Sequence, residues 1–318
     1  MLGLWQALTL AKAGHSVRVI DAGEAPFIAS ASRWAGAMLA PECEAESAPE
    51  LVRDLGRQSL AHWRAAIPGI VENGTLVLAP ARDQGELRRF ARVTEGHETM
   101  TEAAIGKLEP DLAGRFSAAL YYRSEAHMDA GAALSALLAA CRNAGVAFKF
   151  GRRLDAAAPG MIVDCRGFGA KADIANLRGV RGERLVVKTT EVQLSRPVRL
   201  IHPRQPIYVV PQGDGRFVIG ATVVEREDGG PMTVRAALEL LGSAYALHPA
   251  FAEAAILDMG AGVRPALPDN VPRVFIERSG QLIRVNGAYR HGFLLAPILG
   301  EAVAAFVDSG QRAHPLIA

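Results

Sequence analysis

The sequence predicts an α/β fold, in which a Rossmann-like nucleotide-binding domain is assembled from several segments and receives an inserted α+β domain with an antiparallel sheet. Three observations lead to this prediction. Helical and strand patterns alternate at the beginning of the chain, near residues 130–165 and at the end. Strand patterns separated by Pro and Gly, which favour hairpins, lie between these segments. The first residues have the spacing of a nucleotide-binding helix followed by a strand.

The first elements are predicted from residue spacing. Apolar residues from Leu4 to Ala11 recur with a helical period, and Gly14 is placed to end this helix. Residues 16–20 form an apolar run typical of a buried strand, which ends in Asp21. A Gly-, Ala- and Ser-rich segment of irregular structure follows over residues 22–46.

The remaining elements follow from the same two periods. A helix is predicted over residues 48–67, with Leu51, Leu55, Leu60 and Trp63 on one face. Further helices are predicted over residues 86–93, 102–108, 130–144, 234–247 and 293–308. Strands are predicted over residues 75–79, 119–123, 146–150, 161–164 and 281–287, with several more between 183 and 220. Asp129 precedes the helix at residue 130 and is expected to cap it.

These elements divide the chain into two predicted domains. Residues 1–44, 125–182 and 258–318 are assigned to the nucleotide-binding domain. Residues 45–124 and 183–257 are assigned to the inserted, substrate-binding domain. The chain of 318 residues is long enough for two domains and a sizeable core.

Composition excludes several classes of function. Half of the residues are hydrophobic and 21% are charged, as in ordinary globular proteins, and the net charge of +2 is too small to attract nucleic acid. No apolar run approaches the ~20 residues needed to cross a bilayer, and no secretory signal is recognised. The three cysteines are far apart, which favours a reducing compartment and no metal site. We therefore expect a cytoplasmic protein without nucleic-acid or membrane partners.

The first motif fits part of a dinucleotide fingerprint. Gly3, Gly14 and Asp21 have the spacing of the third glycine of GxGxxG and of the helix and strand after it, including an acidic residue for the adenosine ribose. The first strand and two glycines would precede Met1. Because losing a central strand leaves two open edges, we expect the cellular protein to begin earlier. An ordinary helix–turn–strand pair fits this segment equally well.

Four further segments occur in order along the chain: SRWAGAMLAPECE (32–44), YVVPQGDGRFVIGAT (208–222), GVRPALPDNVP (262–272) and GAYRHGFLLAPILGEAVA (287–304). Together with the first motif they resemble the D-amino-acid oxidase superfamily of FAD enzymes, and most closely the glycine oxidases of thiamine biosynthesis. The resemblance implies non-covalent FAD and oxidation of a small amine, chiefly glycine, to the imine. Molecular oxygen would be reduced to hydrogen peroxide. Homo-oligomers are common in this family.

The resemblance also implies a substrate site. Arg264 matches the arginine that binds the substrate carboxylate, and a bidentate guanidinium pair supplies both charge and orientation. Gly262 and Pro265 beside it predict a rigid turn that aims the side chain. Tyr208 matches the tyrosine that lies over the substrate, although a buried structural tyrosine is an equal alternative. Arg290 matches a position that borders both flavin and substrate.

A second group of residues is implied to contact FAD. Small residues are needed where a loop passes beside a flat ring, and N–H groups at a helix start favour the flavin O2. These residues are Gly3, Asp21, Ser32, Ala35, Gly36, Met38, Gly167, Gly292, Phe293 and Leu294. Two positions depart from the family pattern: Cys165-Arg166-Gly167 replaces the usual Ala-Thr-Gly, and Val223 replaces a methionine that often lines the pocket.

Three alternatives remain at this stage. The chain could be another member of the superfamily, namely a sarcosine oxidase or a D-amino-acid oxidase. It could be a dehydrogenase that passes electrons to a quinone. It could also be a flavin-free, non-catalytic remnant, because the GxG loop is absent. The sequence shows no Ser/His/Asp or metal-binding pattern, which agrees with hydride transfer to a flavin.

Overall fold

Helices and strands alternate in the computed structural model, which describes residues 1–154 and 160–318. The helices are α1 (Leu2–Lys12), α2 (Pro41–Glu44), α3 (Glu50–Ala66), α4 (Gln84–Val93), α5 (Glu102–Leu108), α6 (Ala130–Asn143), α7 (Val234–Leu247) and α8 (Gly292–Ser309). The strands are β1 (Arg18–Ile20), β2 (Met38–Leu39), β3 (Thr75–Leu78), β4 (Glu98–Thr101), β5 (Ala118–Tyr122), β6 (Ala126–His127), β7 (Ala147–Lys149), β8 (Ile162–Asp164), β9 (Arg178–Lys188), β10 (Val198–Leu200), β11 (Ile207–Pro211), β12 (Arg216–Gly220), β13 (Ala255–Ala266), β14 (Arg273–Glu277) and β15 (Leu282–Asn286).

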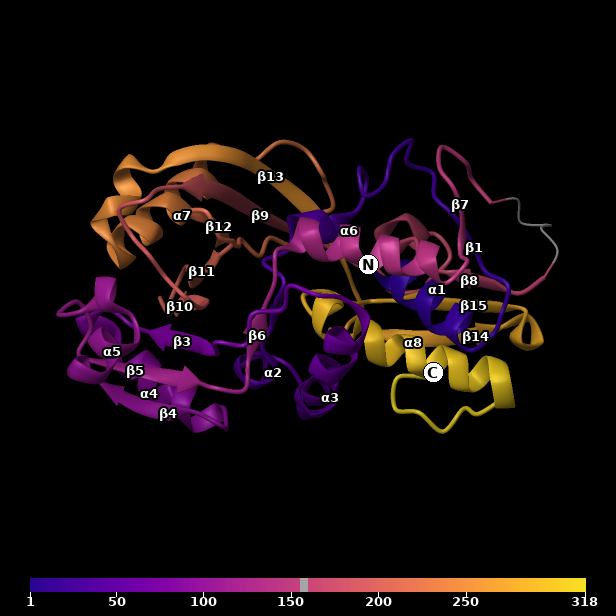
Figure 1. The fold of residues 1–318 in the computed structure, drawn as a ribbon, viewed down its shortest axis with the longest axis horizontal. Coiled ribbons are helices and arrows are strands. Elements are labelled where there is room, and N and C mark those ends of the chain that lie inside the picture. Colours follow the sequence, from indigo (N-terminus) through magenta and orange to yellow (C-terminus); the bar gives the residue numbers. More distant parts are fainter. Residues whose placement is uncertain (155–159) are drawn as a thin grey trace.

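Two lobes lie side by side (Figure 1). One lobe is built on an eight-stranded sheet in the order β13-β9-β12-β11-β10-β3-β5-β4. The other, the nucleotide lobe, has β1 paired in parallel with β7, and β8 paired in parallel with β15, which also pairs with β14. Each of β1 and β8 has one edge without a strand partner among the described residues. The α/β class with a mainly antiparallel second sheet is therefore confirmed.

Helix α1 packs closely on α8. The apolar period of the sequence buries Leu4, Trp5 and Leu8 in the core of the nucleotide lobe. A Cβ at Gly300 of α8 would lie 2.8 Å from the Thr9 hydroxyl, so this glycine allows the two helices their close approach. Gly14 takes the left-handed conformation, with φ of +94°, and ends the helical segment as predicted.

Helix α8 is the most apolar of the long helices that the structure describes. By length and composition alone its 18 residues could cross a membrane, but 61% of them are buried inside this structure, as in a core helix. It lies against α1 on one side and α3 on another. The helix is therefore fixed in the centre of the nucleotide lobe, with its first turn directed at the site described below.

Helix α3 also belongs to the core of the nucleotide lobe. Its buried face includes Val52, Leu55 and Trp63, whereas the predicted face residues Leu51 and Leu60 are only half-buried. The sequence prediction assigned residues 45–124 to the inserted domain, but α3 packs on α8. An amphipathic pattern in the sequence does not reveal which lobe the apolar face of the helix contacts.

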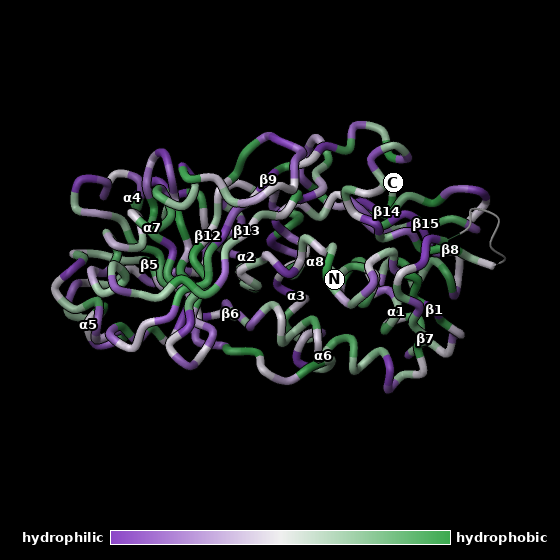
Figure 2. Tube along the Cα trace, turned by 90° about the horizontal axis from the view of Figure 1, so that it is seen from above, coloured by the Kyte–Doolittle hydropathy of each residue, from purple (hydrophilic) through white to green (hydrophobic). Residues whose placement is uncertain are grey.

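The eight-stranded sheet has a hydrophobic core on each face. One core joins the strands to α5 and α7, and a smaller one joins them to α4. Figure 2 shows hydrophobic residues, in green, concentrated around β12, and hydrophilic residues, in purple, on many of the outer loops. Strands that are buried on both faces carry such nearly continuous hydrophobic runs.

Strand β13 corrects one local prediction. Its 12 residues pair with β9, and Arg264 lies inside this strand, not in the rigid turn predicted from Gly262 and Pro265. Glycines and a proline obscured the strand pattern. Because β13 is the edge strand of the sheet, the missing N–H of Pro265 is tolerated there.

Candidate active site

A cavity of about 1940 Å³ is lined by residues of both lobes. All thirteen site residues predicted from the sequence line it: Gly3, Asp21, Ser32, Ala35, Gly36, Met38, Gly167, Tyr208, Arg264, Arg290, Gly292, Phe293 and Leu294. The exposed edges of β1 and β8 contribute Val19 and Val163 to the same cavity. The fold thus brings distant parts of the sequence to one place.

Glycines on the sheet set the position of Tyr208. In the antiparallel register Tyr208 of β11 lies opposite Gly220 of β12, and a Cβ there would lie 2.5 Å from the tyrosine hydroxyl. A Cβ at Gly36 would lie 2.7 Å from the ring. The ring is therefore held between the sheet and the loop that carries Gly36, and Gly36 is needed for Tyr208 as well as for the small contour predicted beside a flavin.

Arg264 lies across the sheet in the same way. A Cβ at Gly182 of β9 would overlap its guanidinium, and its Nη1 donates to the carbonyl of Thr222 at 3.1 Å. Among the described residues no carboxylate lies within ion-pair distance of this guanidinium. Burial lowers the pKa of Arg264 while Tyr208 and Tyr289 oppose this, and a guanidinium remains charged under such shifts. Arg264 is therefore a cation open to an anionic ligand.

The hydroxyl of Tyr208 is a hydrogen-bond donor at neutral pH. Burial raises its pKa above the ordinary value, and the guanidinium groups of Arg264, Arg184 and Arg290 act in the opposite direction. The phenol therefore keeps its proton, and it lies close enough to Arg264 for the guanidinium charge to act on it. A donor and a cation that converge in this way fit a carboxylate.

Arg290 is held at the cavity wall by several groups. Its Nη2 donates to the hydroxyl of Ser47 at 2.5 Å and lies 3.4 Å from Oε2 of Glu44. Its guanidinium also lies 5.4 Å from the ring centroid of Tyr289, within cation–π range. Arg290 thus differs from Arg264, because its charge is already compensated.

Glu44 is a site residue that the sequence reasoning missed. Its carboxylate contacts Arg290, Nδ1 of His291 at 3.2 Å and Nη1 of Arg199 at 3.7 Å. Burial alone would raise the pKa of Glu44, but Arg290, His291 and Arg199 together hold it well below its usual range. Glu44 ends the motif over residues 32–44. Only the fold shows that Arg199 of β10 and the residues directly before α8 contact its carboxylate.

The loop beside the predicted flavin position is fixed to the sheet. Its short helical turn (Ala31–Trp34) is capped by Ser30, whose hydroxyl accepts from the Ser32 N–H. The guanidinium groups of Arg33 and Arg184 lie 4.7 and 4.9 Å from the ring centroid of Trp34, within cation–π range. A Cβ at Gly260 of β13 would overlap this ring. Trp34 therefore connects the loop to the strand that carries Arg264.

Two helix N-termini face the cavity without side-chain caps. Helix α1 begins after Met1 and α8 begins after His291, and neither preceding residue caps its helix through a side chain. The free N–H groups of a first turn favour anions, such as a pyrophosphate or the flavin pyrimidine when it gains charge. Asp21, at the end of β1, uses one oxygen to accept from Gly23 at 2.7 Å. These donors and this acceptor fit the parts of FAD.

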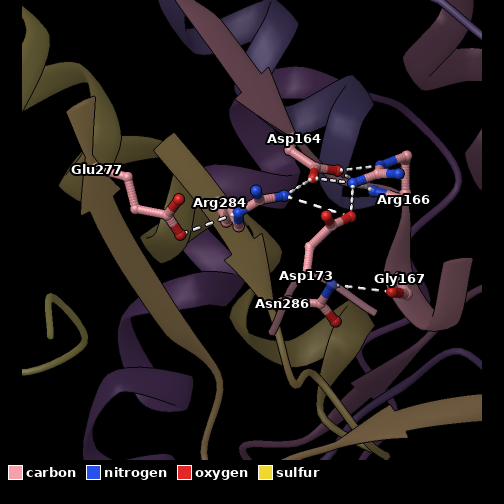
Figure 3. Close-up of polar contacts among 7 residues, drawn as sticks. All are labelled: Asp164, Arg166, Gly167, Asp173, Glu277, Arg284 and Asn286. Carbon is pink, nitrogen blue, oxygen red and sulfur yellow. Dashed lines mark hydrogen bonds and ion pairs between the residues drawn. The ribbon is translucent and has the colours of Figure 1, made fainter. Parts of the chain in front are cut away.

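The turn around Gly167 explains one departure from the family pattern. Arg166 donates to Asp164 at 2.7 Å and to Asp173 at 2.5 Å, and so closes the turn after β8 (Figure 3). Asn286 of β15 donates to the Gly167 carbonyl at 2.9 Å, and Gly167 has φ of +58°. The arginine thus provides charge-assisted hydrogen bonds in a place where the family pattern has threonine.

Val223 and the cysteines are the remaining positions of interest. Val223 is half exposed at the mouth of the cavity, which agrees with a residue that shapes the entrance. The three cysteines are free thiols. Within residues 1–154 and 160–318, no three His, Cys, Asp or Glu side chains gather in a way that could hold a metal ion.

Comparison with known proteins places the chain in a class. The family model described as FAD dependent oxidoreductase matches residues 1–306, so the chain belongs to this family. A putative thiamine biosynthesis oxidoreductase ThiO from Rhizobium etli is 54% identical over 302 residues, covering 93% of this chain and 92% of the relative. A glycine oxidase from Geobacillus kaustophilus is 26% identical over 356 residues, covering 99% of this chain and 93% of the relative.

A solved structure agrees with the fold. The crystal structure of the glycine oxidase from Geobacillus kaustophilus superimposes with a TM-score of 0.82 at 23% identity, covering 99% of this chain and 94% of that chain. The resemblance inferred from the five motifs is thereby confirmed. FAD is the cofactor of this enzyme family, as the sequence predicted.

Proposed function

We propose that this chain oxidises glycine, or a similarly small amino acid, to the imine and supplies it to thiazole assembly in thiamine biosynthesis. One observation carries the substrate assignment: Arg264 faces the cavity beside Tyr208 without an acidic partner among the described residues. The proposal is further supported by the 54% identical relative that is described as a thiamine biosynthesis oxidoreductase. Cytoplasmic location and self-association are part of the same proposal.

Arg264 and Tyr208 orient the substrate. The guanidinium binds the substrate carboxylate, and the Tyr208 hydroxyl donates a second hydrogen bond to it. Because Gly182 and Gly220 hold both side chains against the sheet, the carboxylate position is fixed before substrate arrives. Fixing one end of so small a molecule also fixes the direction of its Cα–H bonds.

The chemistry needs no protein nucleophile. Bound FAD would supply the two-electron redox chemistry: glycine loses a hydride from its Cα and a proton from its amine to give the imine, and O2 takes up these two electrons and two protons to give H2O2. The substrate amine must be uncharged for its Cα–H bond to be oxidised, and the positive charge of Arg264 disfavours the ammonium form. The uncapped start of α8 supplies N–H groups where the flavin pyrimidine would gain charge.

The proposal is tested with the FAD-loaded protein and three amines. Peroxide formation and oxygen consumption are measured with glycine, sarcosine and D-alanine. We expect the highest kcat/KM with glycine, whereas a preference for sarcosine would indicate a sarcosine oxidase. Preference for D-alanine would indicate a D-amino-acid oxidase, and electron transfer to a quinone without peroxide would indicate a dehydrogenase. Rescue of a strain that requires thiazole tests the pathway assignment.

A further inference from the structure

Four guanidinium groups, those of Arg264, Arg184, Arg290 and Arg199, lie near Tyr208, and the three that line the cavity differ in their partners. Arg264 has no carboxylate partner among the described residues, whereas Arg290 and Arg199 share the carboxylate of Glu44 at 3.4 and 3.7 Å. All three arginines and Glu44 line the cavity. The local charge is therefore distributed unevenly: one guanidinium is open and two are compensated.

The sheet register places Arg199 next to the substrate position. Arg199 of β10 and Tyr208 of β11 are direct partners in the antiparallel pair, so their side chains leave the same face about 5 Å apart at the Cβ atoms. The side chains of Arg199 and Arg290 are 17% and 27% exposed. Both guanidinium groups line the same cavity as Arg264 and Tyr208, so a substituent on a substrate bound at Arg264 would extend into the space that they line.

Glu44 contacts both of these cations, Arg290 at 3.4 Å and Arg199 at 3.7 Å. Its side chain is only 13% exposed, and its neighbours keep it ionised. Glu125 also faces Arg199 and accepts the Cys43 N–H at 2.8 Å, but burial raises the pKa of Glu125 to about 7. His291 contacts the same oxygen of Glu44 as Arg290 does. At neutral pH Glu44 is therefore the main counter-charge of Arg199 and Arg290.

We propose that Glu44 determines the substrate class: by neutralising Arg199 and Arg290 it leaves Arg264 as the guanidinium that binds a carboxylate beside Tyr208. The enzyme then takes amines with one carboxylate and rejects amines with two. This inference rests on the proposed amine oxidation. Substituting Glu44→Gln keeps the shape of the side chain but releases two positive charges, which can then bind a second carboxylate.

The test compares two substrates of similar size. N-ethylglycine has one carboxylate, and iminodiacetate has a second one at the end of its N-substituent. In the FAD-loaded wild type we expect kcat/KM to be at least about tenfold higher for N-ethylglycine, and in the Glu44→Gln variant this ratio falls about tenfold or more. Adding Arg199→Met to Glu44→Gln reverses part of the change. An unaltered ratio in Glu44→Gln overturns the inference.

Glu42→Gln is the matched control. Glu42 lies two residues earlier on α2, its side chain is 5% exposed, and it pairs with Arg57 through both oxygens, but it does not line the cavity. This variant loses an equally buried carboxylate from the same helix. We expect its substrate ratio to equal that of the wild type. A change as large as that of Glu44→Gln would show a general effect of α2 and would overturn the specific role of Glu44.

A binding measurement separates this inference from the proposed activity. Ethoxyacetate and diglycolate are the oxygen analogues of N-ethylglycine and iminodiacetate, and calorimetry gives their affinities without turnover. The wild type is expected to bind ethoxyacetate more tightly, and Glu44→Gln to shift the preference at least about tenfold towards diglycolate. Failure to oxidise any amine contradicts the proposed function. If the wild type and Glu44→Gln have the same ratio of affinities for the two analogues, the role of Glu44 is contradicted. This conclusion also holds if the variant loses FAD, because the measurement needs no turnover.

Discussion

Glycines on the eight-stranded sheet determine where the ligand-binding side chains lie. Gly182 lies beneath the guanidinium of Arg264, and Gly220 beneath the hydroxyl of Tyr208. A strand glycine lowers stability because it has no side chain to pack and a flexible backbone. Here the missing side chains create the space in which an arginine and a tyrosine lie flat against the sheet.

Gly182→Ala is expected to displace Arg264. The new Cβ would overlap the Arg264 Cζ, and the guanidinium is the flexible end of its side chain. We therefore predict that the KM for glycine rises about tenfold or more through a misplaced carboxylate partner, while the melting temperature changes little. Gly242→Ala, on α7 with no atom near its Cβ, is the control and leaves KM unchanged. Equal KM values in both variants would refute the geometry.

Individual site residues were predictable to different degrees. Arg264 and Tyr208 lie in motifs whose pattern is visible in the sequence, and both line the cavity. Their roles toward substrate stay predictions. Glu44 and Arg199 could not be found, because their contact depends on the pairing of β10 with β11 and on the position of α8. Sequence spacing does not contain this information.

At the scale of elements, the short pair β2–β6 fixes the loop beside the predicted flavin position. Met38 of β2 pairs with His127 of β6, and His127 is buried. Burial lowers the pKa of His127 to about 4, from 6.5 in an unfolded chain. A cation at this position would therefore be destabilising, and the imidazole is neutral in the folded protein at neutral pH.

This shift predicts acid sensitivity. Between pH 6.5 and about 4 the unfolded chain binds more protons at His127 than the folded protein does, so the free energy of unfolding falls as the pH falls. The loss is at most about 3 kcal/mol. Urea unfolding of the wild type and of His127→Gln at pH 7.5 and 4.5 measures it. A pH dependence that is the same in both proteins would contradict the assignment to His127.

Trp63 connects α3 to the first turn of α8. Its indole N–H donates to the carbonyl of Phe293 at 2.9 Å, and its ring stacks on Phe293 and meets Trp5 edge-on. Trp63→Phe loses this hydrogen bond and leaves a cavity, so we predict that the free energy of unfolding falls by about 2 kcal/mol. Because Phe293 lines the cavity, FAD binding should weaken as well. Urea denaturation tests the first effect and flavin titration the second. An unchanged urea midpoint would contradict the predicted loss of stability, and an unchanged Kd for FAD would contradict the predicted loss of binding.

Helices were easier to predict than strands. The helical period over residues 234–247 gives the observed bounds of α7, and Asp129 caps α6 as expected. Strand β13 was missed because its glycines carry no periodic signal, and its conformation comes from pairing with β9. Tertiary pairing thus decided the structure where the local pattern was weak.

For the whole molecule, the relevant feature is a cavity lined by two lobes with separate hydrophobic cores. The motifs predicted both lobes, because each motif marks a turn or strand end that borders the cofactor region. The predicted domain boundaries at residues 44, 124, 182 and 257 stay a proposal. The location of α3 could not be predicted, since it depends on which lobe covers its apolar face.

FAD binding should stabilise the whole chain. A ligand that binds only the folded protein adds about 2.7 kcal/mol at a concentration of 100 Kd. The starts of α1 and α8 and the Gly167 turn all border the cavity, so we expect FAD to raise the melting temperature of the apoprotein. Differential scanning calorimetry with and without FAD measures the shift. An unchanged melting temperature in saturating FAD would contradict the site.

The most direct measurement is the KM for glycine of the Arg264→Ala variant in its FAD-loaded form. A bound carboxylate that loses a buried, charge-assisted partner loses several kcal/mol, so we predict that KM rises at least about 100-fold while the flavin stays bound. Arg264→Lys keeps the charge but not the bidentate geometry, so its KM for glycine should lie between those of the wild type and Arg264→Ala. Steady-state kinetics with glycine that equal those of the wild type would contradict the placement of the substrate at Arg264.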